Sequence, residues 1–254
     1  MTGLTGEQLT ELTARVHQQT GALISRGRPF ALGLFKSVVL VVMLLRRNIT
    51  QEFAAGIFGV SQPTVSRRWD LLRPVIGVAL AEFVPDPARV IGAGTALVDG
   101  TICPTWNWHA HPGLFSGKAG MPGINVQIAA DLEGKLVAVG TVPVPGARHD
   151  AFAFAASGLA STLTDLHTIA DLGYLGVDGI DQTPIRKPRG RTLRSIDAAF
   201  NTQIASIRAA VERAVACLKT WRMLSEEGGR FRAPIEKFAS MLEAVVGLHF
   251  FSTL

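Results

Sequence analysis

The sequence predicts an α/β fold, in which a mixed sheet with flanking helices follows an all-α N-terminal domain. The apolar periodicity changes from helical to extended near Val84–Arg89, where two prolines flank Asp86. Beyond this boundary, three extended segments precede a helix and one more short apolar segment, an order typical of a mixed sheet. We therefore expect a helical domain over residues 1–88 and an α/β domain over residues 89–254.

Helical segments fill the N-terminal domain. Thr5 is placed to cap the first helix, and a mostly apolar core helix follows over residues 32–47. Thr50 would cap a short third helix, Gly59 stands where a turn needs a positive φ angle, and Ser61 would cap the next helix. A helix, a glycine-containing turn and a polar, basic helix form the helix-turn-helix pattern, whose second helix enters the DNA major groove.

The second helix of this motif carries the side chains that would contact DNA. Amide, hydroxyl and guanidinium groups can read base edges, and hydroxyl or basic groups can bind phosphate. The alternative is an ordinary three-helix bundle with a solvated basic face. The residues assigned to base edges are Gln62, Thr64 and Arg67, and those assigned to phosphate are Ser66 and Arg68.

The first extended segment, residues 96–105, brings the carboxylate of Asp99 into a buried-looking strand. Burying an unpaired charge is costly, so this group is expected to have a partner, and a divalent metal is a suitable one. The alternative is a strand that ends at Asp99-Gly100, since this dipeptide is a common hairpin turn.

The remaining extended segments complete the predicted sheet. Residues 123–132 and 135–144 would form an antiparallel pair, and Asp150 would cap the helix that follows. The short apolar segment 166–170 reads as a parallel strand that ends in a second acid, Asp171. The two strand-borne acids of the chain would then lie on neighbouring strands.

A basic loop follows the sheet. Residues 186–194 hold five basic residues in nine positions, together with a proline and a glycine. This composition suits a loop that tracks a phosphate backbone, and it suits a solvated tether equally well. The residues assigned to DNA are Arg186, Lys187 and Arg189.

A long helix is expected over about residues 196–224, and a last amphipathic helix over residues 234–248 could pack on the sheet. On the long helix, offsets of four and seven residues bring three charged side chains within about 40° of each other, on one stripe. They are Arg208, Glu212 and Lys219. Such a stripe can also be a surface ladder of charge pairs.

Charge is segregated along the chain. Residues 1–95 carry 10 Lys and Arg against 6 Asp and Glu, residues 96–184 carry 3 against 8, and residues 185–254 carry 12 against 6. An acidic centre between two basic flanks suits a protein that gathers cations at a site and holds a polyanion around it. Charge can also segregate on a surface by chance.

The N-terminus and the cysteines bear on location. Cys103 and Cys217 have neither metal-ligand spacing nor a disulfide framework, which indicates a reducing compartment. The first residues lack the basic region of a signal peptide, and the apolar run Ser37–Leu45 is too short to cross a bilayer. We expect a cytoplasmic protein with no membrane partner.

Six blocks of sequence, in one order from Val98 to Leu224, resemble the Asp-Asp-Glu (DDE) transposases of bacterial insertion sequences. The resemblance is to the branch of insertion-sequence family five and Harbinger-type elements, to which an N-terminal helix-turn-helix also belongs. A single block such as DGT is weak, whereas six in register are specific. The blocks are VDGTICP (98–104), SGKAGMPGINVQ (116–127), PVPGARHDA (143–151), ADLGYLG (170–176), RKPRG (186–190) and IRAAVERAVACLKTWRML (207–224).

The resemblance implies a ribonuclease-H-like catalytic domain with a metal-binding triad of Asp99, Asp171 and Glu212. The family's Arg-x3-Glu-x6-Lys signature is present in the stripe described above, whereas Ala205 replaces its usual tyrosine. The same resemblance implies that Arg208, Lys219 and Lys118 contact DNA, and that His149 and Asp150 are adjacent to the site rather than ligands.

The chemistry of these residues is consistent with phosphodiester cleavage. Three acids without a His or Cys cluster suit Mg²⁺ better than zinc, and Mn²⁺ can substitute for it. Two such ions activate water, stabilise the leaving oxygen and neutralise the phosphoryl group. By resemblance, Asp99 would bridge both ions, and Asp171 and Glu212 would each hold one. Gly100 would leave a gap in side-chain cover beside the metals and the phosphate.

The leading hypothesis is a transposase that binds double-stranded DNA at terminal inverted repeats, cuts the ends and joins them to target DNA. The resemblance implies a homodimer or a larger synaptic assembly. One alternative is a catalytically retired DNA-binding regulator, which metal-dependent strand scission would exclude. The other is a non-transposing DDE endonuclease, which joined strand-transfer product would exclude.

Overall fold

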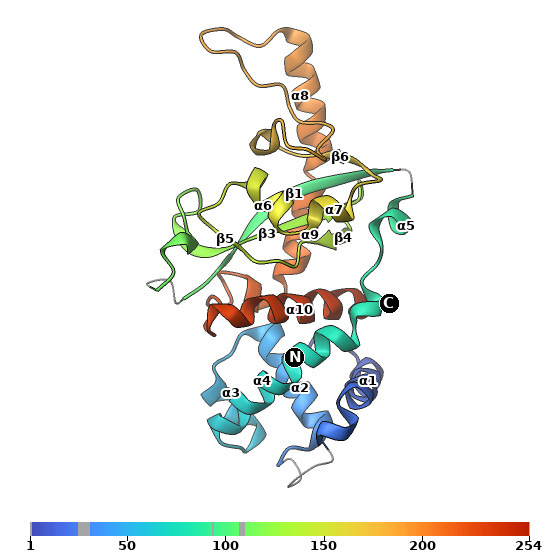
Figure 1. Ribbon diagram of the computed structural model, residues 1–254, viewed down its shortest axis with the longest axis vertical. Helices are drawn as coiled ribbons and strands as arrows, with labels where there is room; N and C mark the ends of the chain where they lie inside the picture. The colour runs from blue at the N-terminus through green and yellow to red at the C-terminus, as the bar shows by residue number, and fades with distance from the viewer. Residues whose placement is uncertain (1, 25–30, 93, 107–109, 254) are drawn as a thin grey trace. The chain divides into compact units, whose positions relative to one another are not determined.

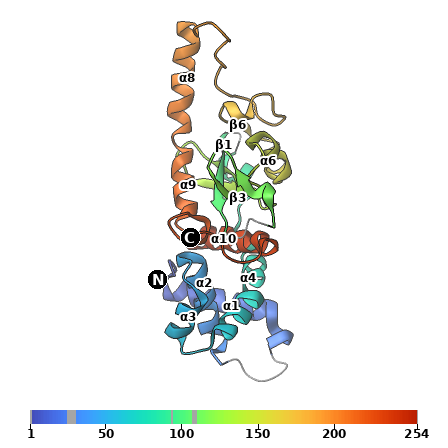
Figure 2. The same cartoon turned by 90° about the vertical axis from the view of Figure 1, so that its left-hand side faces the viewer.

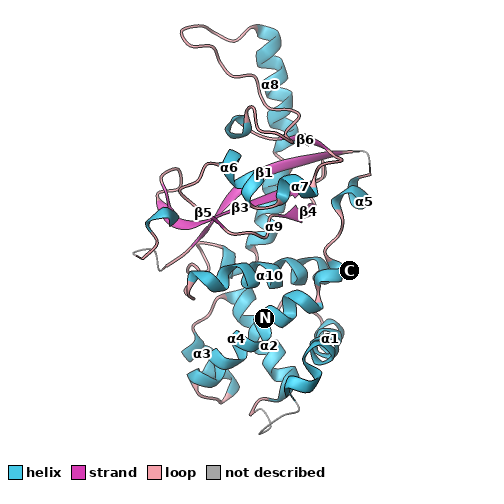
Figure 3. Ribbon diagram, in the orientation of Figure 1, coloured by secondary structure: helices cyan, strands magenta, loops and turns pink. Residues whose placement is uncertain are grey.

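The computed structural model describes residues 2–24, 31–92, 94–106 and 110–253 (Figure 1). The chain divides into two compact units, one of Met1–Val84 with Lys219–Leu254 and one of Pro85–Leu218. Within the described ranges, the first unit is helical and the strands belong to the second (Figure 3). This is the predicted α/β class, with helices before a mixed sheet, and it agrees with a ribonuclease-H-like fold.

The helical unit is organised by local capping. The first helix begins with a capping box, in which Thr5 N–H donates to Gln8 Oε1 (3.0 Å) and Gln8 N–H to Thr5 Oγ1 (3.1 Å). Thr50 Oγ1 accepts from Phe53 N–H at 3.2 Å, and Gly59 takes a left-handed conformation with φ of 64°. These start and turn signals were predicted correctly. The helices are α1 (Gly6–Ile24), α2 (Gly33–Arg47), α3 (Gln51–Phe58), α4 (Gln62–Ala79) and α10 (Phe238–Ser252), with 3₁₀ turns η1 (Ala81–Phe83), η4 (Arg222–Leu224) and η5 (Ile235–Lys237).

Helix α10 joins the helical unit because it is apolar on nearly every side and packs on α4. Polar contacts add to this packing, since Arg73 donates to Ser240 at 3.0 Å and Lys237 pairs with Asp70 at 2.6 Å. The compact units therefore differ from the expected division into residues 1–88 and 89–254. As functional domains, those two ranges remain a prediction.

The second unit is built on a sheet in the order β2-β3-β1-β6, with β4 and β5 also paired to β3. Strands β1 and β3 run antiparallel, and β6 runs parallel to β1. The two strands predicted to carry acids are neighbours: Asp99 lies in β1, whereas Asp171 lies two residues beyond the end of β6. The strands are β1 (Thr95–Pro104), β2 (Phe115–Ser116), β3 (Met121–Ala130), β4 (Leu136–Val139), β5 (Val144–Pro145) and β6 (His167–Ile169).

The expected strand over residues 135–144 is divided into β4 and β5. Gly140 separates them at a point where the chain passes close to Ser157, because a Cβ atom at Gly140 would lie 2.5 Å from Ser157 Oγ. Helices α6 (Asp150–Ala156) and α7 (Leu159–Thr162) cover the sheet, and Phe154, Leu159 and Val98 are among the buried residues of this core. The other elements of the unit are α5 (Pro87–Ile91), η2 (Pro112–Leu114), η3 (Leu172–Tyr174), α8 (Ser195–Arg208) and α9 (Val211–Lys219).

The single helix expected over residues 196–224 is wrong, because α8 ends at Arg208 and α9 begins at Val211. The two helices follow one another along nearly one axis, and α8 extends beyond the sheet (Figure 2). The β3–β4 turn contacts the break. Arg213 donates to the Glu133 carbonyl at 3.2 and 2.8 Å, and a Cβ atom at Gly134 would lie 2.4 Å from the Ala210 oxygen. The break between α8 and α9 therefore coincides with a tertiary contact, and no proline or glycine marks it in the sequence.

Across the described residues, no helix combines the length and the apolar character that crossing a membrane requires.

Candidate active site

Among the carboxylates of the sheet, Asp99 has the pKa that is shifted most from its ordinary value. Its side chain is 18% exposed, and its Oδ1 accepts from Gly100 N–H at 3.0 Å and lies 3.6 Å from Arg208 Nη2. Burial raises the pKa of Asp99 to about 6, against the opposing effect of Arg208 and the Gly100 N–H. The nearby charges of Asp171 and Glu212 contribute to this rise. The three predicted triad carboxylates therefore interact electrostatically in the folded chain.

The other two acids come from separate elements. Asp171 precedes the turn η3 and its Oδ1 accepts from Gly173 N–H at 2.7 Å, which orients the carboxylate. Glu212 is exposed in the first turn of α9. The three acids are 72 and 41 residues apart in sequence, and they come from strand β1, the end of strand β6 and the start of helix α9. The fold brings Asp171 and Glu212 close enough to Asp99 to affect its pKa.

Arg208 is part of this carboxylate site. It was assigned to DNA, but its guanidinium faces Asp99, its side chain is 19% exposed, and its Nε is buried without a hydrogen-bond partner among the described residues. Because α8 ends at Arg208 and α9 begins three residues later, the expected stripe is interrupted between Arg208 and Glu212. Lys219 is the last residue of α9.

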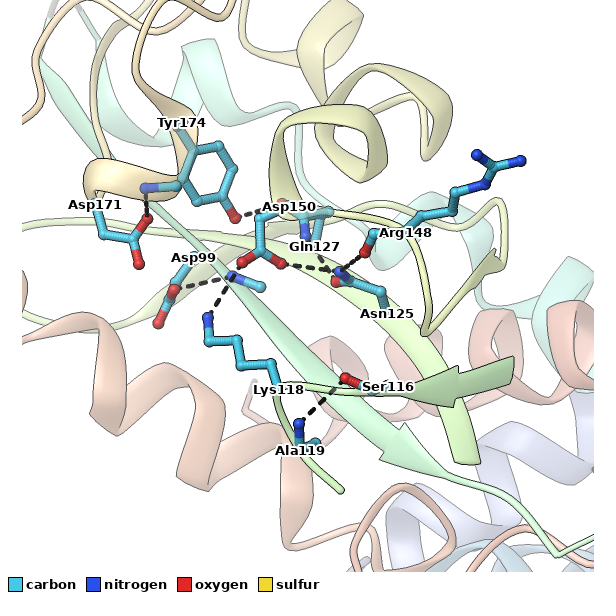
Figure 4. A network of polar contacts seen from close by, with 12 residues as sticks. Asp99, Ser116, Lys118, Ala119, Asn125, Gln127, Arg148, Asp150, Asp171 and Tyr174 are labelled. Carbon is cyan, nitrogen blue, oxygen red and sulfur yellow. Dashed lines mark hydrogen bonds and ion pairs between the residues drawn. The ribbon is translucent and has the colours of Figure 1, made fainter. Parts of the chain in front are cut away.

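Lys118 reaches the site from the turn between β2 and β3. Its side chain is 80% exposed, and its Nζ lies 3.3 Å from Asp150 Oδ2. The charge of Asp150 raises the pKa of Lys118, and Asp171 and Asp99 add to the effect against the cost of burial. Figure 4 shows the amine beside the carboxylates of these three aspartates. Lys118 is therefore an internal counter-ion of the cluster.

Asp150 does not cap helix α6, contrary to the prediction. His149 is the N-cap residue and is exposed, whereas Asp150 is the first helical residue. Its Oδ1 instead accepts from Asn125 Nδ2 at 2.8 Å, because β3 presents this amide to the start of α6. The carboxylate of Asp150 lies near those of Asp99 and Asp171 (Figure 4), so it adds a fourth acid to the candidate site.

Three uncharged residues that were not predicted complete the cluster. Tyr174, Gln127 and Asn125 form a chain of hydrogen bonds behind the aspartates (Figure 4). In the sheet register Gln127 is paired with Gly100. Two amide residues at alternate positions of a buried strand, opposite a glycine, were the sequence signal for this network.

Gly100 leaves no open gap beside the acids, so that expectation is wrong. A Cβ atom at this position would lie 2.5 Å from Asp150 Oδ1, 2.5 Å from Gln127 Nε2 and 3.1 Å from Asn125 Oδ1. Protein side chains fill the space where the strand lacks a side chain of its own.

The donor set fits a hard divalent cation. Within the ranges that the structure describes, no three His, Cys, Asp or Glu side chains stand in position to hold an ion. The carboxylates of Asp99, Asp171 and Glu212 nevertheless provide the oxygen ligands that Mg²⁺ prefers, and their repulsion contributes to the raised pKa of Asp99. A bound cation would offset this repulsion.

In the helical unit, the predicted DNA-contacting residues of α4 lie on two faces. Thr64 and the exposed Arg67 share one face, where Arg67 Nη2 lies 3.3 Å from Thr64 Oγ1. Gln62 and Ser66 instead line a cavity of about 360 Å³ with Trp69 and the segment around Phe231. Burial and the neighbouring Arg67 lower the pKa of Arg68, which is only partly exposed. Among the five predicted contacts, Arg67 is the one exposed residue.

The basic loop is anchored at its start and exposed beyond it. Asn201 of α8 binds both backbone groups of Ile185, at 2.7 and 3.0 Å. The predicted phosphate contacts that follow, Arg186, Lys187 and Arg189, are all exposed. Helix α8 therefore holds the loop with its cations open to solvent.

Comparisons with known proteins single out one family. A family model described as "DDE superfamily endonuclease" matches residues 98–249, and one described as "Helix-turn-helix of DDE superfamily endonuclease" matches residues 30–82. A relative from Streptomyces albus G, described as a transposase for insertion sequence element IS112, is 30% identical over 226 residues, or 88% of this chain and 84% of the relative. A relative from Microchaete diplosiphon, described as a transposase for element IS702, is 29% identical over 140 residues, or 54% and 49%. No solved structure gives a significant match.

Proposed function

Because the chain belongs to the DDE superfamily, among the transposases of insertion sequences, we propose that it cuts the ends of such an element and joins them to target DNA. The observation that supports this proposal is that Asp171 and Glu212, which come from two other elements, both act electrostatically on Asp99. The protein would act on double-stranded DNA as a homodimer or a larger synaptic assembly.

The three acids would hold two Mg²⁺ ions, for which Mn²⁺ can substitute. When bound, these ions supply an activated nucleophile and neutralise charge on the phosphoryl group. The chain's own residues prepare the site. Arg208 favours the ionised form of Asp99, and the Gly173 N–H orients Asp171. Lys118 and the exposed loop cations would bind phosphates of the DNA backbone.

Loss of the carboxylate of Asp171 or of Glu212 is expected to abolish DNA cleavage. Asp171→Ala and Glu212→Ala should each reduce nicking of DNA that carries the element's inverted repeats to background, because each change removes a cation ligand. The assay contains Mg²⁺ or Mn²⁺, and DNA binding is measured separately in EDTA, where both variants should match the wild type. Asp165→Ala, which changes an exposed acid of the same unit, is the control and should cut normally. Cleavage by Asp171→Ala at the parental rate would refute the assignment, and tight binding without scission by the wild type would favour a retired regulator.

The two faces of α4 predict unequal effects on DNA recognition. Arg67→Ala should weaken binding to the inverted repeats by about 1–3 kcal/mol, or roughly 5- to 150-fold, if the exposed guanidinium reads a base. Ser66→Ala should change it less than about twofold, because Ser66 lines the cavity. Fluorescence anisotropy with a repeat and a scrambled duplex measures both the affinity and the specificity. Equal losses for the two variants would contradict the assignment of the faces.

A further inference from the structure

Asp150 stands at the end of a directional chain of hydrogen bonds. Tyr174 Oη donates to Gln127 Oε1 (2.6 Å), and Gln127 Nε2 donates to Asn125 Oδ1 (2.8 Å). Asn125 Nδ2 then donates to Asp150 Oδ1 (2.8 Å) and to the Arg148 carbonyl (3.3 Å). The three bonds that link Tyr174 to Asp150 all point in one direction, from the hydroxyl to the carboxylate.

The chemistry of the two ends determines this direction. An ionised carboxylate only accepts, so Asn125 must turn its NH₂ group toward Asp150 and its carbonyl toward Gln127. The carbonyl of Gln127 then faces a hydroxyl that has to donate. Burial and the nearby aspartates raise the pKa of Tyr174, so its hydroxyl keeps the proton that it donates. The network thus has one self-consistent arrangement.

The network is buried, and the carboxylate of Asp150 at its end faces the site. Tyr174 and Gln127 are fully buried and Asn125 is 3% exposed, so each unmet polar group there would carry a desolvation cost. With Oδ1 held by Asn125, the second oxygen of Asp150 faces Lys118 and the neighbouring acid. A Cβ atom at Gly173 would lie 2.9 Å from Asp171 Oδ1 and 3.7 Å from Asp150 Oδ2.

We propose that Asp150 is a positioning residue for the divalent cation, held by the Tyr174–Gln127–Asn125 relay, and that Lys118 competes with this cation in the cation-free protein. The inference rests on the proposed function, because it concerns the cation that the triad would hold. Asp150 adds negative charge at a fixed position beside Asp171. Lys118 neutralises the same charge until the cation replaces it, and its amine then becomes available to a DNA phosphate.

Binding of Mn²⁺ to the full chain without DNA tests this inference by isothermal titration calorimetry. Asp150→Asn should weaken Mn²⁺ binding about 10-fold or more, in the range found when partners of metal ligands are lost. Tyr174→Phe should weaken it less, and should add nothing when combined with Asp150→Asn, because it acts through the same carboxylate. Lys118→Met should strengthen Mn²⁺ binding, because it removes the competing cation, and should weaken DNA binding. Asp165→Asn is the control for loss of a surface charge.

The outcomes separate the inference from the proposed function. If Asp150→Asn and Tyr174→Phe lower the unfolding temperature in EDTA but leave the Mn²⁺ affinity unchanged, the network is only structural and the inference fails. Unchanged or weaker Mn²⁺ binding by Lys118→Met would overturn the competition. If the wild type binds no Mn²⁺, or if Asp171→Ala binds it as tightly as the wild type, the proposed metal site itself is wrong. Should Asp150→Asn not fold, Tyr174→Phe and Lys118→Met still decide the matter.

Discussion

Asp99→Asn is expected to abolish DNA cleavage and, without metal at neutral pH, to make the protein harder to unfold. Asparagine keeps the shape of the side chain but removes the charge that a cation needs. It also removes a charge that folding has to desolvate. Burial, together with the charges of Asp171 and Glu212, raises the pKa of Asp99 to about 6, because Arg208 offsets only part of their effect. The charge of Asp99, which suits metal binding, therefore destabilises the metal-free fold.

The stabilisation should depend on pH with a defined sign. The pKa of Asp99 in the folded chain lies above its ordinary value of 3.8, so the folded state binds this proton more tightly than the unfolded state. Through this group, the free energy of unfolding of the wild type falls as the pH rises from about 4 to about 6. Asp99→Asn does not lose stability in this way, because an asparagine side chain does not ionise. Its advantage should be small near pH 4 and reach up to about 3 kcal/mol above pH 6, or up to roughly 6–12 °C in midpoint.

Thermal unfolding in EDTA at acidic and at neutral pH measures this effect. Addition of Mg²⁺ at neutral pH should raise the midpoint of the wild type but not that of Asp99→Asn, because ligand binding stabilises only a protein that binds it. Asp165→Asn should behave as the wild type under each condition. A variant that still cuts DNA, or one that melts below the wild type in EDTA at neutral pH, would contradict the assignment of Asp99.

Gly100→Ala is expected to destabilise the α/β unit by about 2–4 kcal/mol, since it combines overpacking with the loss of buried hydrogen bonds. The added Cβ would lie 2.5 Å from both Asp150 Oδ1 and Gln127 Nε2. Neither atom can withdraw freely, because each is held in the relay that Tyr174 begins. The relay would have to open, so cation affinity should fall together with stability.

Chemical unfolding and Mn²⁺ titration of Gly100→Ala measure the two effects. Gly113→Ala is the matched control, because the nearest atom to its Cβ would be Pro145 Cβ at 3.9 Å, an ordinary contact. This control should lie within about 0.5 kcal/mol of the wild type. If Gly100→Ala were as stable as the control, the close approach of Asp150 and Gln127 to strand β1 would be wrong.

The charges of the site form a balance between acids and internal cations. Four carboxylates gather around β1, and two basic residues, Arg208 and Lys118, pair with Asp99 and Asp150 respectively. Arg208 is largely buried, whereas Lys118 is mostly exposed and can leave at little cost. This difference is the physical reason for assigning the exchange with a divalent cation to the lysine.

Local rules made much of the fold predictable. A cap such as Thr5 or Thr50 and a left-handed glycine such as Gly59 act within a few residues, so the sequence next to them carries the whole signal. The change from helical to extended periodicity likewise located the sheet, and Asp99 and Asp171 became candidates because each lies in or at the end of a predicted strand.

Contacts between residues that are distant in sequence could not be predicted. Nothing near Asp150 indicates that an amide of β3 replaces its capping role, and Ala209-Ala210 carries no sign of a helix break. The faces of α4 were also undetermined, because the segment around Phe231 that closes the cavity lies far along the chain.

By itself, the sequence determined the α/β class and the helix-turn-helix, because both depend on local pattern, and through its resemblance to a family it named Asp99, Asp171 and Glu212 as the candidate triad. Only the tertiary structure decided that Arg208 faces Asp99, that α10 packs on α4, and that a buried relay ends on Asp150. These features depend on how side chains that are distant in sequence satisfy one another's charges and hydrogen bonds once water is excluded.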